Sequence, residues 1–159
     1  MSPSEFWGNN YYKHPPLSTE LIYQFEETFR VKLPLLLIEL LNYQNGGYTK
    51  DFGYPMNLKT SWGDSHVPFD AMSGIVIDPT IKTAFNLMDG DYLQAEWGLP
   101  PKQILLNGTG AWWVSLDFRS STSPSVLWID TDVNEMVPIA PSFNHFYDGL
   151  RPISEFIVE

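Results

Sequence analysis

The spacing of the apolar residues changes once along the chain, and this change limits the possible folds more than any other feature. Before Asn45-Gly46-Gly47, apolar side chains recur at helical spacing in two segments. The first follows Ser18, a good N-cap residue, and ends near Arg30; the second covers residues 34–43, with its proline at the first helical position. Glycine should stop the second helix, because it adopts the left-handed conformation of a helix C-terminus at little cost. We expect two helices here, after an irregular segment at residues 1–16.

The remainder of the chain is typical of short strands. Runs rich in β-branched and aromatic residues are separated by turns of Asp, Asn, Gly and Pro. These runs lie at residues 67–69, 74–77, 104–106, 112–118, 126–129 and 136–139. Residues 107–110 predict a turn between two of them. Trp112 and Trp113 should point to opposite faces of a sheet, since neighbouring side chains alternate along a strand.

Two more helices complete the pattern. A brief helix should begin near Asp91 and end at Gly98, and a last helix should follow Ser142 as its N-cap. This order predicts an α+β fold with a mainly antiparallel sheet packed against helices, two N-terminal and one C-terminal. Because the 159 residues contain no linker, we expect a single domain over residues 1–159.

The charge balance excludes several classes of partner. Nine basic residues stand against 19 acidic ones, a net charge of −10. Nucleic-acid binding needs clustered Lys and Arg, and anionic membranes attract basic segments, so we expect neither partner. A basic protein would instead be attracted, although the charge could simply keep the chain in solution. The chain has no Cys, no leader-like N-terminus and no apolar run of about 20 residues, which predicts a cytoplasmic protein.

Two groups of polar residues suggest catalysis at first sight. Asp64, Ser65 and His66 contain the residue types of a hydrolase triad, but no oxyanion-stabilising turn surrounds Ser65. Asp89-Gly90-Asp91 could supply paired carboxylates, yet two acids around a glycine are typical of a turn followed by a helix cap. The residues therefore predict no catalytic site.

Metal and cofactor sites are not expected either. Residues 130–134 begin like a calcium loop, but Glu135 and Pro141 stand where that loop needs Gly and Glu, so we interpret the segment as a hairpin turn. The three histidines, His14, His66 and His145, lack the spacing of a zinc site.

Three blocks of residues, in order, cover most of the chain. They are Leu33-Pro34 with the apolar helix up to Asn45-Gly46-Gly47; Leu99-Pro100 with the strand up to Leu116-Asp117-Phe118-Arg119; and Val126 to Asp130 with Ile139-Ala140-Pro141-Ser142-Phe143 and Phe146. Together they resemble the SUKH superfamily, which includes fungal cell-wall-synthesis regulators of the Smi/Knr type. The resemblance spans residues 17–150, although no block falls between Tyr48 and Trp97.

The resemblance implies a single SUKH-like α+β domain without known catalysis. Bacterial members are commonly immunity proteins that neutralise toxins, often nucleases, whereas fungal members act as interaction hubs. This short chain is more similar to the bacterial type. Our leading hypothesis is thus a non-catalytic, cytoplasmic immunity protein for a cognate, basic protein toxin. The alternatives are a regulatory scaffold or small-ligand-binding module without a toxin, and a hydrolase that uses Asp64, His66 or the Asp89/Asp91 pair.

Aromatic anchors within an acidic rim would suit such a partner, because aromatic side chains dominate the energy of many interfaces. We expect them in the middle of the chain, where no family block lies, although the same residues could simply occupy turns. The predicted partner-binding residues are Tyr48, Asp51, Tyr54, Trp62, Asp64, His66, Asp89 and Asp91.

Overall fold

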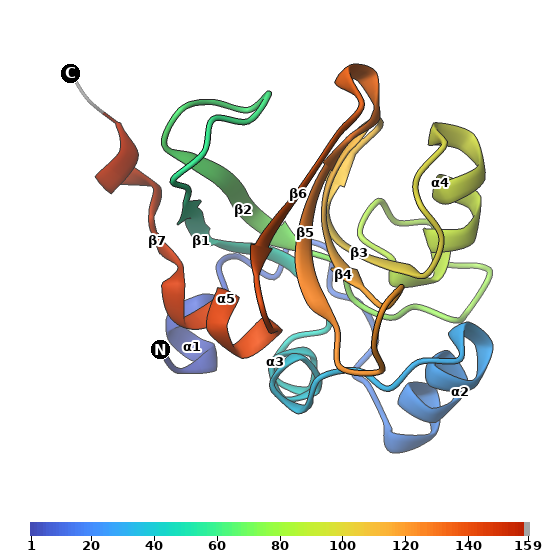
Figure 1. Ribbon diagram of the computed structural model, residues 1–159. Helices are drawn as coiled ribbons and strands as arrows, with labels where there is room; N and C mark the ends of the chain where they lie inside the picture. The colour runs from blue at the N-terminus through green and yellow to red at the C-terminus, as the bar shows by residue number, and fades with distance from the viewer. Residues whose placement is uncertain (158–159) are drawn as a thin grey trace.

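The computed structural model describes residues 1–157 and confirms the α+β class (Figure 1). The α-helices are α1 (Pro3–Phe6), α2 (Thr19–Phe29), α3 (Leu35–Tyr43), α4 (Gly90–Trp97) and α5 (Phe143–Gly149). The strands are β1 (Gly47–Pro55), β2 (His66–Met72), β3 (Gln103–Thr109), β4 (Trp112–Asp117), β5 (Ser125–Asp130), β6 (Glu135–Ala140) and β7 (Arg151–Pro152). Short 3₁₀ turns are η1 (Leu87–Asp89), η2 (Thr131–Val133) and η3 (Ile153–Phe156).

The strands form two antiparallel sheets. The larger one is a meander in the order β3-β4-β5-β6, and the smaller one has the order β2-β1-β7. The backbone N–H of Ser73 donates to the carbonyl oxygen of Leu106 at 2.8 Å, which brings the end of β2 against β3. In Figure 1 the β1–β2 loop and the tip of the β5–β6 hairpin project toward the same end of the molecule, with α2 and α3 at the opposite end.

Apolar side chains cover both faces of the larger sheet. On one face, Val114 and Trp128 belong to the main core, which α1, α3, α5 and the smaller sheet complete. On the other face, Trp113 and Ile129 pack with Leu93 of α4 in a smaller cluster. Trp112 lies on the main-core side and Trp113 on the other, which confirms the predicted alternation of this pair.

Most predicted helix boundaries are confirmed. Ser18 Oγ accepts a hydrogen bond from the Leu21 N–H at 3.2 Å, and Ser142 Oγ accepts one from the His145 N–H at 3.0 Å. Gly98 ends α4 in the left-handed conformation. The proline before α3 is its N-cap and not its first residue, because its ψ of 138° is extended. None of the helices in residues 1–157 is long and apolar enough to cross a bilayer.

The expectation of an irregular segment at residues 1–16 is wrong for its first part. Glu5 Oε1 accepts a hydrogen bond from Ser2 Oγ at 2.8 Å, which supports the start of α1. Phe6 and Trp7 are then buried, and Trp7 Nε1 donates to the carbonyl oxygen of Leu40 at 2.9 Å. One helical turn carries too little periodicity to be recognised in a sequence; burial against α3 and β1 stabilises it instead.

The strand expected at residues 74–77 is also absent, and side-chain amides explain why. Asn45 accepts from the Ile75 N–H and donates to the Ile75 carbonyl, both at 2.8 Å. Asn86 accepts from the Val76 N–H at 3.1 Å and donates to the Val76 carbonyl at 2.9 Å. These two asparagines satisfy the backbone groups that a neighbouring strand would otherwise pair. The extended run therefore stays single, apart from one bridge between Gly74 and Asn86.

The remaining differences concern strand ends. β1 escaped the sequence analysis, because its glycines and its bulge between Tyr48 and Phe52 break the period of two. The turn expected at residues 107–110 begins later, since β3 continues to Thr109 and only Gly110 has a positive φ. The hairpin turn expected at residues 130–134 is confirmed, with η2 connecting β5 to β6.

Candidate protein-binding surface

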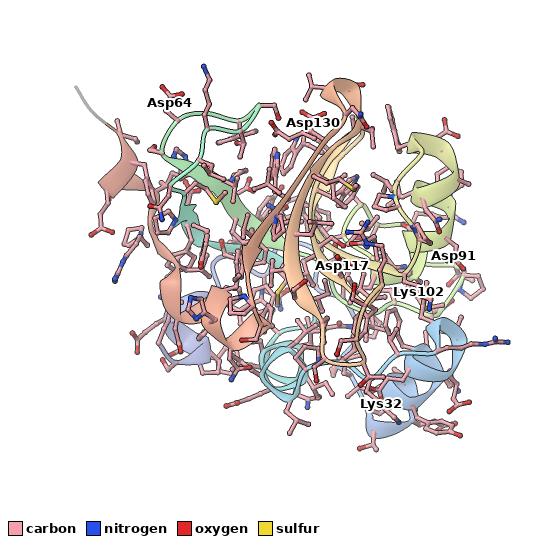
Figure 2. The ribbon with its side chains drawn as sticks, in the orientation of Figure 1. Lys32, Asp64, Asp91, Lys102, Asp117 and Asp130 are labelled. Carbon is pink, nitrogen blue, oxygen red and sulfur yellow. The ribbon has the colours of Figure 1, made fainter. Side chains whose placement is uncertain are left out.

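The structure distributes the eight predicted partner-binding residues over several places. Trp62 and Asp64 lie on the β1–β2 loop, with His66 at the start of β2. Tyr48 and Asp51 are exposed along β1, where Asp51 occupies the bulge with a φ of 65°. Asp89 and Asp91 lie at the start of α4, and Figure 2 shows Asp91 far from Asp64. The remaining residue, a tyrosine of β1, lies inside the core.

Tyr54 is this core residue. Its side chain is 8 % exposed and its ring stacks on Phe146 at 4.9 Å between centroids. Burial raises the pKa of its hydroxyl. The alternation along β1 turns this ring inward toward α5, so it has no surface to offer a partner while the fold is intact.

Trp62 is the most favourable anchor among the predicted residues. Its side chain is 45 % exposed, and its ring lies 5.2 Å from that of Trp112. Trp112 in turn stacks on the fully buried Trp128 at 5.6 Å. The three rings connect the surface to the core, so the exposed indole rests on a rigid base.

Hydrogen bonds hold the loop that carries Trp62 against the β5–β6 hairpin. The Ser61 N–H donates to Glu135 Oε1 at 2.9 Å, and Ser61 Oγ donates to Asp130 Oδ2 at 2.6 Å. Trp128 Nε1 also donates to Glu135 Oε1, at 2.7 Å. A loop held in this way loses little conformational freedom when a partner covers Trp62, which favours binding.

Acidic residues lie on the two segments that meet beside this anchor: Asp64 on the β1–β2 loop, and Asp130, Asp132 and Glu135 on the β5–β6 hairpin. We call the set of Trp62, Trp112, Asp64, Asp130, Asp132 and Glu135 the tryptophan surface. Lys59 lies 3.7 Å from Asp64, but both side chains are more than three-quarters exposed, so this ion pair has little energetic weight. Figure 2 shows Asp64 on the β1–β2 loop and Asp130 near the tip of the β5–β6 hairpin, both toward the same end of the molecule. The surface therefore combines one exposed indole with a negative rim.

Sequence reasoning missed most of this rim. Trp112 and Trp113 were expected on opposite faces of a strand, one in the core and one outward, and residues 130–134 were expected to form a turn. Trp112 and residues 130–134 reach Trp62 because the start of β4 and the end of β5 lie beside the β1–β2 loop, at separations of 50 residues or more along the chain. The spacing within a single segment contains no sign of such an approach.

A second aromatic group surrounds Tyr48. Tyr12, Tyr48 and Phe85 have ring centroids 4.9 to 5.7 Å apart, and Tyr11 packs on the edge of Tyr12. His14 joins this group to the core: its Nδ1 lies 2.7 Å from the carbonyl oxygen of Asn45. The adjacent pair Tyr11-Tyr12 is the signal in the sequence that could have drawn attention to it.

The candidate hydrolase residues do not assemble a triad. Ser65 Oγ lies 2.9 Å from His66 Nδ1, but Asp64 pairs with Lys59 and the His66 ring stacks on Phe156 at 4.4 Å. Burial lowers the pKa of His66. A serine hydrolase needs an acid to orient its histidine, and no carboxylate within residues 1–157 bonds to this ring.

Asp89 and Asp91 lie at the start of α4, where each favours the helix. Asp89 occupies the N-cap position of α4, and burial raises the pKa of its carboxyl group, partly countered by Lys82. Asp91 is exposed in the first turn, where a negative charge favours the helix dipole. Within residues 1–157, no three His, Asp or Glu side chains are grouped so that they could hold a metal ion.

Comparison with known proteins gives one result. No curated protein and no solved structure matches the chain. The family model of the SMI1/KNR4 family (SUKH-1) matches residues 16–149, which include α2 to α5 and both sheets except β7. The match confirms the resemblance drawn from the three sequence blocks. The chain therefore belongs to the SMI1/KNR4 family (SUKH-1).

Proposed function

We propose that this protein is a non-catalytic immunity protein that binds and neutralises a basic protein toxin in the cytoplasm. The observation that carries the proposal is the tryptophan surface, where a half-exposed indole on a rigid base stands within an acidic rim. Membership of the SMI1/KNR4 family (SUKH-1) is compatible with this role.

The charge of the chain supports a basic partner. A net charge of −10 accelerates association with a cationic protein and opposes association with acidic ones. Enzymes that act on nucleic acids hold their substrate in a cationic groove. The proposed complex would place Asp64, Asp130 and Asp132 against such a groove and seat Trp62 in an apolar pocket beside it. The toxin would then be inactive because its substrate could no longer enter.

The first experiment tests the function itself. The protein is expressed together with the toxin-like product of the neighbouring gene, and survival of the host cells is counted with and without it. We expect full protection by the wild-type chain. If killing continues at an undiminished rate although both proteins accumulate, the immunity proposal is wrong.

The second experiment tests the surface. Trp62→Ala should weaken toxin binding by at least about 30-fold, corresponding to roughly 2 kcal/mol for an interface anchor. Trp97→Ala is the matched control, since Trp97 is similarly exposed but lies on α4. Binding is measured by isothermal titration calorimetry, after thermal unfolding has shown that both variants are folded. Equal affinities of the two variants would place the interface elsewhere without refuting the immunity role.

A further inference from the structure

A groove of about 940 Å³ lies on another side of the molecule from the tryptophan surface. The end of α2, α4, the start of β3 and the segment after β4 form its walls. Phe29, Ile104 and Phe118 provide apolar lining. Figure 2 shows Lys32, Lys102 and Asp91 around it, at the opposite end of the larger sheet from Asp130.

The groove concentrates the scarce basic residues of the chain. Four of the nine lysines and arginines line it, whereas three of the 19 acidic residues do. One of these acids, Glu26, is already engaged, because it accepts from the Leu33 N–H at 2.7 Å and pairs with Lys32 at 3.7 Å. The lining residues therefore carry an excess of one positive charge, in contrast to the net charge of −10 of the whole chain, and salt screens the acids that lie more than about 8–10 Å away.

Among the described residues, two cations of the groove are unpaired, and a third is paired but keeps free donors. Within residues 1–157, neither Arg30 nor Lys102 has a carboxylate within 4 Å. Arg119 is held by Asp117, which accepts from its Nε and Nη2, both at 2.9 Å. Because a guanidinium has five N–H donors, this pairing positions Arg119 and leaves donors for a second carboxylate.

The backbone shows that two of these cations occupy unfavourable positions. Arg30 and Lys102 have φ values of 56° and 57°, in the left-handed region that favours glycine. A residue with a Cβ is less stable than glycine in this conformation, because the Cβ lies too close to the following carbonyl oxygen. Both positions nevertheless carry a long basic side chain, and both border the same groove.

We propose that this groove binds an acidic peptide segment of a second protein partner, with apolar side chains of the segment against Phe29, Ile104 and Phe118. Its carboxylates would pair with Arg30, Lys102 and Arg119. The proposal does not depend on the immunity role, because it concerns a different surface with the opposite charge. It gives the molecule two binding surfaces, one for a basic protein and one for an acidic segment.

Fluorescence anisotropy tests the proposal with a fluorescein-labelled peptide of alternating Asp or Glu and Leu or Phe residues, and a control peptide with Lys in place of the acids. The acidic peptide should bind more tightly than the basic one, and more weakly as salt increases. The double variant Arg30→Gly and Lys102→Gly should reduce affinity about 3–10-fold, as expected for two exposed charge pairs. It should also raise Tm by about 2–4 °C per site, because glycine suits both positions.

Lys13→Gly is the matched control. Lys13 is also basic with a positive φ, but it lies outside the groove, so the substitution should leave peptide binding unchanged while it stabilises the fold. The proposal is overturned if the basic peptide binds as well as the acidic one, if neither binds, or if the double variant keeps full affinity. Displacement of the peptide by inorganic phosphate at a similar concentration would also overturn it, in favour of a small-anion site.

Discussion

Asn45 connects segments that are distant in the chain, and its replacement is the most informative perturbation of this fold. Its side chain is 6 % exposed and makes three hydrogen bonds of 2.8 Å. Two of them satisfy the N–H and the carbonyl of Ile75, and the third reaches the carbonyl of Pro15. Asn45→Ala would remove all three bonds and leave the backbone groups of Ile75 without protein partners.

The magnitude follows from the burial of those groups. Ile75 is almost fully buried, so water cannot easily replace the amide, whereas Pro15 is exposed and its carbonyl can be hydrated. A buried backbone group without a partner costs about 1–3 kcal/mol, and the two groups of Ile75 together about 4 kcal/mol. This is a large part of the roughly 5–15 kcal/mol that stabilises a typical domain. We therefore expect Tm to fall by about 10 °C.

Urea unfolding followed by tryptophan fluorescence measures this change. Asn86→Ala is the matched control, because Asn86 bonds Val76 in the same way but is only half-buried, so water can replace part of what is lost. We expect it to cost roughly 1–2 kcal/mol. If Asn45→Ala costs less than about 1 kcal/mol, or no more than Asn86→Ala, then the side-chain amides do not take the place of a neighbouring strand.

Five further substitutions give three separate tests. An alanine series, measured by urea unfolding, should separate backbone strain from crowding. Gly63→Ala, with open space around it, should be neutral, and Gly98→Ala, at a φ of 65°, should cost about 1 kcal/mol. Gly108→Ala should cost more than about 2 kcal/mol, because its Cβ would lie 2.2 Å from a backbone oxygen. An order other than this would refute the packing around β3 and β4. Burial, with nearby carboxylates, raises the pKa of Tyr147 to about 12, so the folded state keeps this proton while the unfolded chain loses it near pH 10. Stability should fall between about pH 10 and 12 in the wild type and less steeply in Tyr147→Phe, as unfolding at several alkaline pH values would show. Burial alone would raise the pKa of Asp117, but hydrogen bonds from Arg119 and Gln103 lower it below its ordinary value. The free energy of unfolding should therefore fall as pH drops below about 4. Asp117→Asn should make this fall less steep when unfolding is measured at several acidic pH values.

The candidate binding surface was only partly predictable. Trp62 and Asp64 were expected from residue type, and both lie on the tryptophan surface. Asp130 and Trp112 join them only because the β1–β2 loop folds onto the β5–β6 hairpin. Tyr54 was expected at the same surface, but the alternation of a strand that escaped prediction turns it into the core. The groove with Arg30 and Lys102 was not expected at all, because its walls come from four separate segments.

Elements whose signals are local could be predicted from the sequence alone. Ser18, Gly98 and Ser142 end or begin helices through hydrogen bonds and conformations within a few residues, so the α+β class could be predicted from spacing and caps. The three ordered blocks likewise indicated the SMI1/KNR4 family (SUKH-1) before any contact was known.

Features that depend on partners far along the chain became visible only in the folded molecule. Asn45-Gly46-Gly47 was interpreted as a helix stop, yet its asparagine replaces a strand for residues 30 positions away. A Cβ on Gly46 would lie 2.3 Å from the backbone of Gly74, so the same triplet also permits close approach of the two segments. Side-chain amides, buried rings and surface charges contact residues that are distant in sequence. The sequence shows which of these groups are present, but not which of them come into contact.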